Sequence, residues 1–234
     1  MKTIVLTGAS KGIGRELALQ LAKEGTNLGL VARGETELKA LQQEVLALGA
    51  ACEIFVGSVS DAALATQTIN TMTARFGGID VLINNAGYGI FGPTESYTEE
   101  QWSDLYDTNV KGTFLFCKAA LAPMKAAQSG HIINVASDVA KRVFDGGALY
   151  CSSKFAQDAF SAALRKEVRK DGIKVSVVYS GLVDTHFHAL PQGDDHHADW
   201  LKASDMANTI RYIINQPKHV VIDELMIHPL SQDY

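Results

Sequence analysis

Short apolar runs alternate with helix-length stretches from one end of the chain to the other, and this alternation limits the possible folds more than any other feature. The runs lie at 3–7, 27–32, 52–56, 81–83, 131–135, 174–179 and 220–226, and the longest helical patterns at 61–76, 99–127, 149–170 and 204–215. The runs are rich in Val and Ile without strict alternation, which is typical of strands buried on both faces of a parallel sheet. The sequence therefore predicts an α/β fold with a doubly wound parallel sheet.

The composition narrows the class of protein further. The 234 residues contain no repeat or linker, so we expect a single domain over 1–234, and the net charge of −5 argues against non-specific binding of nucleic acid. No apolar run approaches the roughly 18 residues that a membrane span needs, and 1–10 is too short for a signal peptide. Cys52, Cys117 and Cys151 lack the spacing of metal ligands. We expect a cytoplasmic enzyme or binding protein without a metal.

A glycine-rich turn follows the first strand and opens the first helix. It spans Thr7–Gly14 (TGASKGIG). Glycines allow a tight turn and a close approach of a pyrophosphate, whose charge then faces the free N–H groups of the helix N-terminus. The spacing G-x-x-x-G-x-G differs from both G-x-G-x-x-G and a Walker loop. The glycines could serve the turn alone, but the order of strand, turn and helix favours a nucleotide site.

The turn resembles the T-G-x-x-x-G-I-G motif of the classical short-chain dehydrogenases/reductases, and three further segments match that family in register. Residues 84–87 (NNAG) resemble its N-N-A-G, and Asn109 resembles its catalytic asparagine. Ser137 and 150–154 (YCSSK) resemble its active-site Ser and Tyr-x-x-x-Lys. The resemblance covers about residues 3–190. It implies a Rossmann-type fold with helices on both faces of the sheet and an oxidoreductase that interconverts a carbonyl and a secondary alcohol.

The resemblance also implies a role for each matching residue. Tyr150 would exchange a proton with the substrate oxygen, Ser137 would bind that oxygen, Lys154 would hold the nicotinamide ribose, and Asn109 would hold a water. The implied cofactor-binding residues are Gly8, Ser10, Lys11, Gly12, Ile13, Gly14, Arg33, Ser58, Val59, Asn85, Ala86, Gly87, Tyr150, Lys154, Gly181, Val183 and Thr185.

The spacing of Tyr150 and Lys154 is itself suited to acid–base chemistry. Four residues apart on a helix, the two side chains share one face. Lowering the pKa of a Tyr from about 10 to about 7 takes roughly 4 kcal/mol. An ammonium about 4 Å away supplies roughly 4 kcal/mol at an effective dielectric constant of 20. A Tyr that merely packs on a Lys stem is the simpler alternative, but the complete set with Asn109 and Ser137 favours catalysis.

Two cations indicate which nicotinamide cofactor binds. The second strand ends in Ala32-Arg33, where members of the family that use NAD carry an Asp. Arg33 can pair with a 2′-phosphate in a bidentate fork, and Lys11 adds a second charge. Both could be ordinary surface cations, and Glu35 and Glu37 lie close by. We predict NADP(H) rather than NAD(H).

The chain departs from the family pattern at two positions. Ser58 replaces an Asp that contacts adenine, so we expect weaker adenine binding. Ser180 replaces a Pro before Gly181, so the loop beside the nicotinamide loses a rigid residue.

A polar stretch at about 182–200 is the expected substrate loop. It holds four histidines and four carboxylates, namely His186, His188, His196 and His197 with Asp184, Asp194, Asp195 and Asp199. Their spacing is not the i, i+4 pattern of a zinc helix, so we predict no metal. The loop could equally be a polar surface segment. The tail at 223–230 faintly resembles members of the family that act on small 3-hydroxy acids.

Two classes of function remain open from the sequence. The first is an NADP(H)-dependent oxidoreductase acting on a small-molecule carbonyl or alcohol. The second is an NADP(H)-binding regulatory or partner-binding module with little turnover, which the changes at Ser58 and Ser180 would suit. The intact catalytic set favours the enzyme.

The family resemblance also implies a homodimer or homotetramer formed by the helices at 99–127 and 149–170. The side chains of Phe155, Ala159, Phe160 and Ala163 could face either a partner or the sheet.

Overall fold

The computed structural model describes residues 1–187 and 191–233. Seven parallel strands form the main sheet in the order β3-β2-β1-β4-β5-β6-β9. They are β1 (Thr3–Thr7), β2 (Asn27–Ala32), β3 (Ala51–Val56), β4 (Val81–Asn84), β5 (Gly130–Ser137), β6 (Ile173–Ser180) and β9 (Glu224–Ile227). A second parallel sheet pairs β7 (Val183–Asp184) with β8 (Leu201–Lys202).

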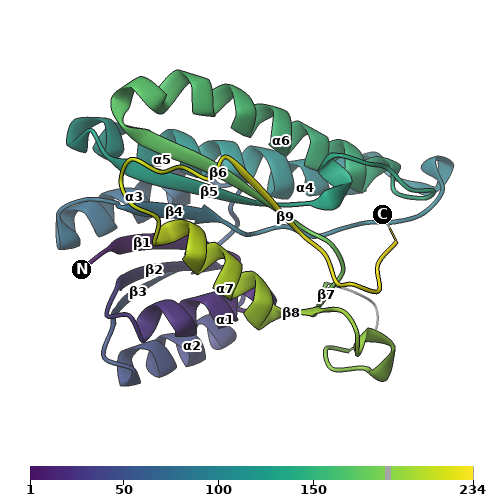
Figure 1. The fold of residues 1–234 in the computed structure, drawn as a ribbon, viewed down its shortest axis with the longest axis horizontal. Coiled ribbons are helices and arrows are strands. Elements are labelled where there is room, and N and C mark those ends of the chain that lie inside the picture. Colours follow the sequence, from purple (N-terminus) through teal and green to yellow (C-terminus); the bar gives the residue numbers. More distant parts are fainter. Residues whose placement is uncertain (188–190, 234) are drawn as a thin grey trace.

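Helices cover both faces of the main sheet, with α1, α2 and α7 on one side and α3 to α6 on the other (Figure 1). The α-helices are α1 (Gly12–Ala22), α2 (Glu35–Ala47), α3 (Ala62–Phe76), α4 (Glu99–Tyr106), α5 (Gly112–Ala127), α6 (Ala148–Val168) and α7 (Ala203–Ile214). This doubly wound arrangement confirms the predicted fold class. No helix in the described part of the chain is both long enough and apolar enough to cross a bilayer.

The strands are apolar without alternation because each has a helical layer on either face. In β1 every residue is buried. Ile4 and Leu6 pack into the core formed with α1, α2 and α7, whereas Val5 packs into the core formed with α3, α5 and α6. Burial on both faces is what the Val- and Ile-rich runs predict.

The predicted helix at 99–127 is divided by a π-helical turn, η2 (Asp107–Lys111). The hydroxyl of Thr113, in the first turn of α5, donates to the carbonyl of Asn109 in this turn at 3.0 Å. The prediction of helix here was correct, but the periodicity of apolar residues could not show that one turn has the i→i+5 hydrogen bonding of a π-helix. Such π turns occur frequently at functional sites, and this one carries Asn109.

A buried chain of polar side chains fixes the middle of the sheet. The Asn84 amide donates to Asn134 Oδ1 at 2.9 Å, and the Asn134 amide donates to Ser161 Oγ at 2.7 Å. Asn84 and Asn134 are partners in the register of β4 and β5. The chain therefore joins two strands and α6, the elements that end at or carry the candidate catalytic residues.

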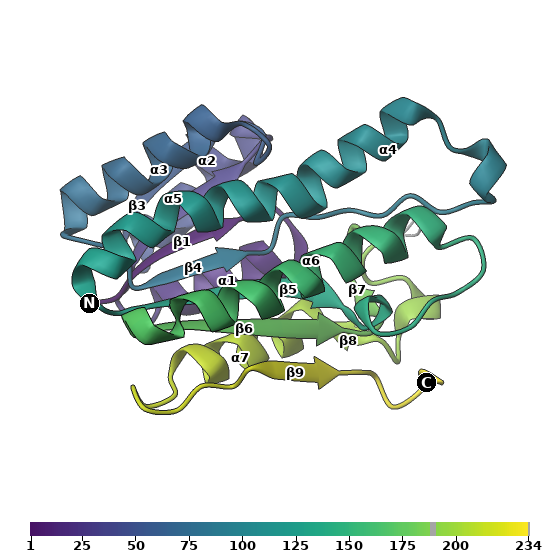
Figure 2. The same cartoon turned by 90° about the horizontal axis from the view of Figure 1, so that it is seen from above.

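The strands of the main sheet all run in one direction, and β7, β8 and the C-terminal end of the chain lie near the edge where those strands finish (Figure 2). Ligands of open α/β sheets bind at this carboxyl edge.

Candidate active site

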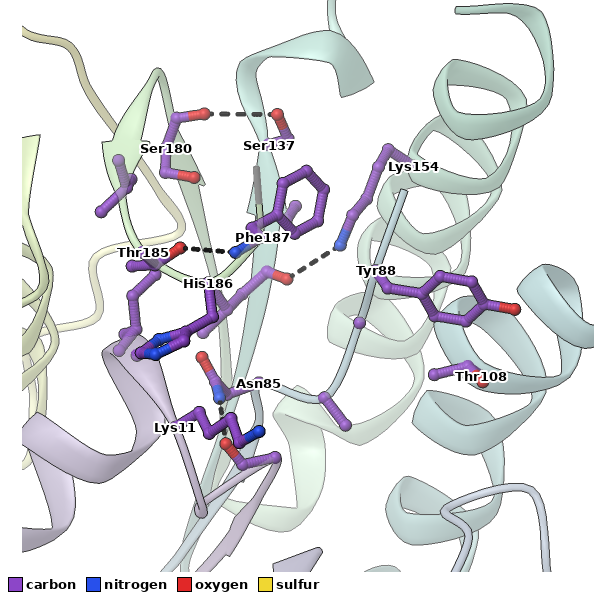
Figure 3. Close-up of a pocket in the computed structure, with 18 of the residues that line it drawn as sticks. Lys11, Asn85, Tyr88, Thr108, Ser137, Lys154, Ser180, Thr185, His186 and Phe187 are labelled. Atoms are coloured by element: carbon purple, nitrogen blue, oxygen red, sulfur yellow. Dashed lines mark hydrogen bonds between the residues drawn. The ribbon is translucent and has the colours of Figure 1, made fainter. Parts of the chain in front are cut away.

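A cavity of about 730 Å³ lies along the carboxyl edge of the sheet. In Figure 3 Lys11 and Asn85 lie toward one end of it, and Ser137, Lys154 and Ser180 toward the other. Of the residues singled out from the sequence, the cavity is lined by Gly8, Ser10, Lys11, Gly12, Ile13, Arg33, Ser58, Val59, Asn85, Ala86, Gly87, Ser137, Tyr150, Lys154, Gly181, Val183 and Thr185. Gly14 and Asn109 lie behind this lining.

The glycine turn is packed so closely at Gly8 and Gly14 that neither position has room for a side chain. Gly8 has a φ of +64°, and a Cβ there would lie 2.8 Å from the Cα of Ala86. A Cβ at Gly14 would lie 2.2 Å from the carbonyl oxygen of Gly8. The Asn85 amide donates to the Thr7 and Gly8 carbonyls at 3.2 and 3.1 Å. The turn therefore presents bare backbone to the cavity at the start of α1, which fits a pyrophosphate.

Gly12 joins this turn to the loop after β6. Its φ is +52°, and a Cβ there would lie 3.3 Å from the side chain of Thr185. The Thr185 hydroxyl accepts a hydrogen bond from the Phe187 N–H at 3.3 Å. The first and sixth strands thus bring both ends of a dinucleotide site to one cavity.

The part of the cavity beyond β2 and β3 carries charged and hydroxyl groups. Arg33 and Glu37 both line it, and the Lys11 ammonium lies 3.6 Å from a Glu37 carboxylate oxygen. The Ser58 hydroxyl is hydrogen-bonded to the Ser60 hydroxyl at 2.9 Å and accepts from the Ser60 N–H at 3.3 Å. Ser58 thus stabilises its own turn while it lines the cavity.

Ser137, Tyr150 and Lys154 meet at the other end of the cavity. Ser137 is the last residue of β5, and Tyr150 and Lys154 lie in the first two turns of α6. All three are buried. Burial raises the pKa of Tyr150, and its hydrogen bond with Ser137 only partly opposes this effect. Burial also lowers the pKa of Lys154 to about 8.

The expectation that Lys154 lowers the pKa of Tyr150 is therefore wrong for this structure. The Lys154 ammonium lies 5.8 Å from the centre of the Tyr150 ring. It donates instead to the Val135 carbonyl at 3.3 Å and to Gln157 Oε1 at 3.1 Å. Loss of hydration disfavours both the phenolate and the ammonium, and the extent of that burial cannot be read from helical spacing.

Asn109 is fully buried beside Lys154. Its Oδ1 accepts from the Tyr88 N–H at 3.1 Å, and its amide donates to the Tyr88 carbonyl at 2.9 Å and to Ser153 Oγ at 3.0 Å. A Cβ at Gly87 would lie 3.2 Å from Asn109 Oδ1 and 3.5 Å from the Lys154 ammonium. Gly87 therefore leaves room for both polar groups at one point.

Three phenylalanines that the sequence analysis missed form a cluster at this end of the cavity, and two of them pack against the Tyr150 ring. Phe91 and Phe187 have ring centres 5.4 and 5.5 Å from that of Tyr150, and Phe144 lies 5.8 Å from Phe91. They come from three separate loops, so no local spacing could have indicated them.

A buried carboxylate next to Ser137 forms a second group that the sequence analysis missed. Asp138 is 3% exposed, accepts from Ser137 Oγ at 3.0 Å and from Arg142 Nε at 2.8 Å, and lies 3.4 Å from His228 Nε2. It also accepts from the Gln232 amide at 2.9 Å, while Gln232 Oε1 accepts from the Leu182 N–H at 2.8 Å.

These contacts bear on the loop that lacks the usual Pro. The Ser180 carbonyl accepts from Ser137 Oγ at 3.3 Å, and the Gly181 N–H donates to the Ile227 carbonyl at 2.8 Å. With the contact from Gln232 to Leu182, hydrogen bonds hold three successive residues where the family has a rigid ring.

Two of the histidines in the following loop are paired with carboxylates, His197 with Asp184 and His196 with Asp194. Asp184 accepts from the Gly193 N–H at 2.9 Å and lies 3.2 Å from both His197 Nδ1 and the Lys202 ammonium. Asp194 caps the next turn by accepting from the His196 N–H at 3.0 Å. Within 1–187 and 191–233, no three His, Cys, Asp or Glu side chains are grouped to hold a metal. His188 lies outside the described residues.

Comparisons with known proteins agree with the fold. The family model described as short chain dehydrogenase matches residues 2–193. A sepiapterin reductase of Chlorobaculum tepidum is 34% identical over 241 residues, which is 100% of this chain and 98% of the relative. An alcohol dehydrogenase from the archaeon Thermococcus sibiricus, complexed with 5-hydroxy-NADP, has a TM-score of 0.94 and 31% identity, covering 100% of this chain and 99% of that one. A metagenomic short-chain oxidoreductase in complex with NADP has a TM-score of 0.86 and 29% identity over 99% and 98% of the two chains.

Proposed function

The chain belongs to the short-chain dehydrogenase family, and from this premise we propose that it is an NADP(H)-dependent oxidoreductase that interconverts a carbonyl and a secondary alcohol. The observation that carries the proposal is the meeting of Ser137, Tyr150 and Lys154 in the cavity that also contains the glycine turn. Its site is the carboxyl edge of the sheet, and its substrate is a small molecule. We expect it to act in the cytoplasm.

The residues that would hold the cofactor fit a dinucleotide. When bound, NADPH supplies a hydride to the substrate carbon. The backbone of the glycine turn would bind the pyrophosphate, Lys154 the nicotinamide ribose, and Thr185 the carboxamide. Arg33 and Lys11 would bind a 2′-phosphate. Two solved structures similar to this chain hold NADP or 5-hydroxy-NADP, which supports the choice of cofactor.

Burial keeps the Tyr150 phenol in its neutral form, and a neutral phenol suits the reductive direction. A phenol that remains protonated at neutral pH can donate its proton to the oxygen of a carbonyl as the carbon is reduced. Ser137 would turn its one hydroxyl proton from Asp138 and the Ser180 carbonyl to the same oxygen, and so orient it. Lys154, with a pKa of about 8, brings a positive charge beside these groups at neutral pH. Asn109 would hold this part of the site in place through its hydrogen bonds to Tyr88 and Ser153. A water bound by Asn109 would lie on the side of Gly87, where a side chain is absent.

The test is cofactor oxidation against a panel of ketones, keto-esters, diketones and quinones. Tyr150→Phe should lower kcat by at least about 1,000-fold, because it removes the proton donor, while NADPH still binds. Tyr212→Phe, on the exposed face of α7, is the control. Turnover of the Tyr150→Phe variant near the wild-type rate would refute the mechanism. NADPH binding without any turnover across the panel would favour the regulatory module instead.

We also propose that the loop at about 182–200 covers the substrate and that the protein forms a homodimer or homotetramer. Phe155, Ala159 and Ala163 are exposed along one side of α6, while Phe160 is partly buried. A partner chain would cover this apolar face. Light scattering after size exclusion tests the assembly, and a clean 25 kDa monomer would rule it out.

A further inference from the structure

We propose that the substrate carries an aromatic ring next to its carbonyl group, and that Phe91, Phe144 and Phe187 form the aromatic cage that binds this ring. The inference rests on the oxidoreductase function proposed above. It names a substrate class that neither the family nor the glycine turn specifies.

The cage lies directly against the proton donor. The Phe91 ring meets the Tyr150 ring edge-to-face at 5.4 Å and 82°, and the Phe187 ring is tilted at 56° at 5.5 Å. Phe91 also lies 6.2 Å from Phe187 and 5.8 Å from Phe144. These separations are those of favourable aromatic pairs. A substrate whose oxygen reaches Tyr150 would therefore have its neighbouring atoms among aromatic rings.

The cage still has apolar surface to bury. Phe91 is 48% and Phe144 41% exposed although both line the cavity. Large apolar side chains grouped in this way at a concave surface mark a binding site. A planar aromatic ring would cover these faces and add edge and face contacts to them.

Two glycines, Gly89 and Gly147, leave the space that the rings of the cage occupy. A Cβ at Gly89 would lie 2.5 Å from the Phe91 ring and 2.9 Å from the Phe187 ring. A Cβ at Gly147 would lie 2.7 Å from the Phe144 ring. Any side chain at either position would displace a cage residue.

The Arg142 guanidinium in the cavity lining does not favour a carboxylate substrate, because a carboxylate of the protein already compensates its charge. Arg142 lines the cavity, but its Nε and Nη2 both donate to the same oxygen of Asp138. Asp138 is only 3% exposed, so its negative charge compensates the guanidinium at close range. A small hydroxy acid, which the tail at 223–230 faintly suggested, would meet this compensated pair and leave the cage empty.

Ketone binding to the wild-type protein saturated with NADP⁺ gives a readout that does not depend on turnover, because the oxidised cofactor has no hydride to give. Calorimetry would compare acetophenone, cyclohexyl methyl ketone, butanone and pyruvate. Acetophenone should bind at least about 30-fold more tightly than butanone, because more apolar surface is buried. It should bind about threefold to tenfold more tightly than the cyclohexyl ketone, which has similar size but no aromatic ring.

Leucine substitutions isolate the aromatic contribution. Phe91→Leu and Phe187→Leu keep an apolar side chain, so each should abolish most of the preference for acetophenone over the cyclohexyl ketone. Phe76→Leu, the same change at the end of α3, should leave the preference unaltered. Near-ultraviolet circular dichroism and NADP⁺ affinity confirm that each variant is folded. If one cage variant does not fold, the other still decides the result.

The outcomes separate the two proposals. Equal binding of the aryl and cyclohexyl ketones, or tighter binding of pyruvate, overturns the cage even if NADPH-dependent reduction is found. Tight, ring-dependent binding of acetophenone without its reduction by NADPH supports the cage and refutes the oxidoreductase. Both ring-dependent binding and reduction, with the aryl ketone giving the highest kcat/KM, support both.

Discussion

The two ends of the cavity are built in opposite ways. The cofactor end is built around the backbone of one short motif, with the side chains of Lys11 and Arg33 beside it; a Cβ at Gly14 would lie 2.2 Å from the Gly8 carbonyl oxygen, and Asn85 donates to the same turn. The substrate end consists of side chains from separate loops, including Phe91, Phe144 and Phe187. A ligand of fixed shape can be bound by a fixed backbone, whereas side chains on loops can change with the substrate. Substitutions at the cofactor end should therefore disturb cofactor binding, and substitutions at the substrate end should disturb ketone turnover.

The largest effect is expected at the cofactor end. Gly14→Ala would force the turn apart, because its Cβ also lies 2.7 Å from the Asn85 amide. Overpacking of this kind costs about 3 kcal/mol of unfolding free energy, and NADPH affinity should fall more than about 100-fold. Urea unfolding and NADPH titration measure both. Gly78→Ala is the control, since no described atom lies within 4 Å of that Cβ. Normal NADPH affinity in Gly14→Ala would show that the turn tolerates change.

Arg33→Asp should change which cofactor the enzyme prefers but not which ketone it reduces. Removing charge-assisted hydrogen bonds to a 2′-phosphate and adding a negative charge should move the NADPH/NADH ratio of kcat/KM by about 100-fold toward NADH. Lys39→Asp alters the net charge equally on α2 without lining the cavity. An unchanged ratio, or the same shift in both variants, would remove Arg33 from the cofactor site.

Lys154 lies where the two ends meet and links stability to pH. Its pKa of about 8 in the folded protein is below the unfolded value near 10.4, so the unfolded chain binds more protons between those values. Stability from this group therefore rises with pH through that window and is lost as pH falls toward 8. Between pH 8 and 9.5 the wild type should gain about 1.5 kcal/mol more than Lys154→Met in urea unfolding. Parallel curves would mean that Lys154 is not desolvated.

The smallest effect is expected from the tail. Gln232→Ala removes the hydrogen bonds to Asp138 and Leu182 and so loosens the loop that lacks the usual Pro. It should lower kcat/KM for the ketone about tenfold and leave NADPH affinity within twofold, since about 1 kcal/mol is typical of a lost hydrogen bond. The same change at the half-buried Gln216, whose amide donates to the carbonyl of Tyr212 one turn earlier, is the control. If NADPH affinity falls more than kcat/KM, the cofactor end and the substrate end of the cavity do not act independently.

The sequence predicted the cofactor end and the sheet because their signals are local. The turn Thr7–Gly14 combines glycine spacing with a strand before it and a helix after it, and the strands follow from runs of Val and Ile. Ser137, Tyr150 and Lys154 were found through a motif and through helical spacing.

The substrate end could not be predicted because its residues have no common spacing. Phe91, Phe144 and Phe187 meet only after three loops are folded, and the contacts of Gln232 span 94 and 50 residues. The pKa of Tyr150 was predicted in the wrong direction because charge spacing can be read from a helix, whereas burial depends on the whole fold.

The buried polar chain from Asn84 through Asn134 to Ser161 has a consequence for how the protein reaches its native state. If β4 paired with β5 one residue out of register, these amides would face the apolar core without partners, at a cost of about 1–3 kcal/mol for each unpaired group. Purely apolar strands would distinguish such slipped pairings far less sharply. The chain thus favours the alignment in which Asn84 lies level with Asn134, which fixes the offset along the sheet edge between Asn85 after β4 and Ser137 at the end of β5.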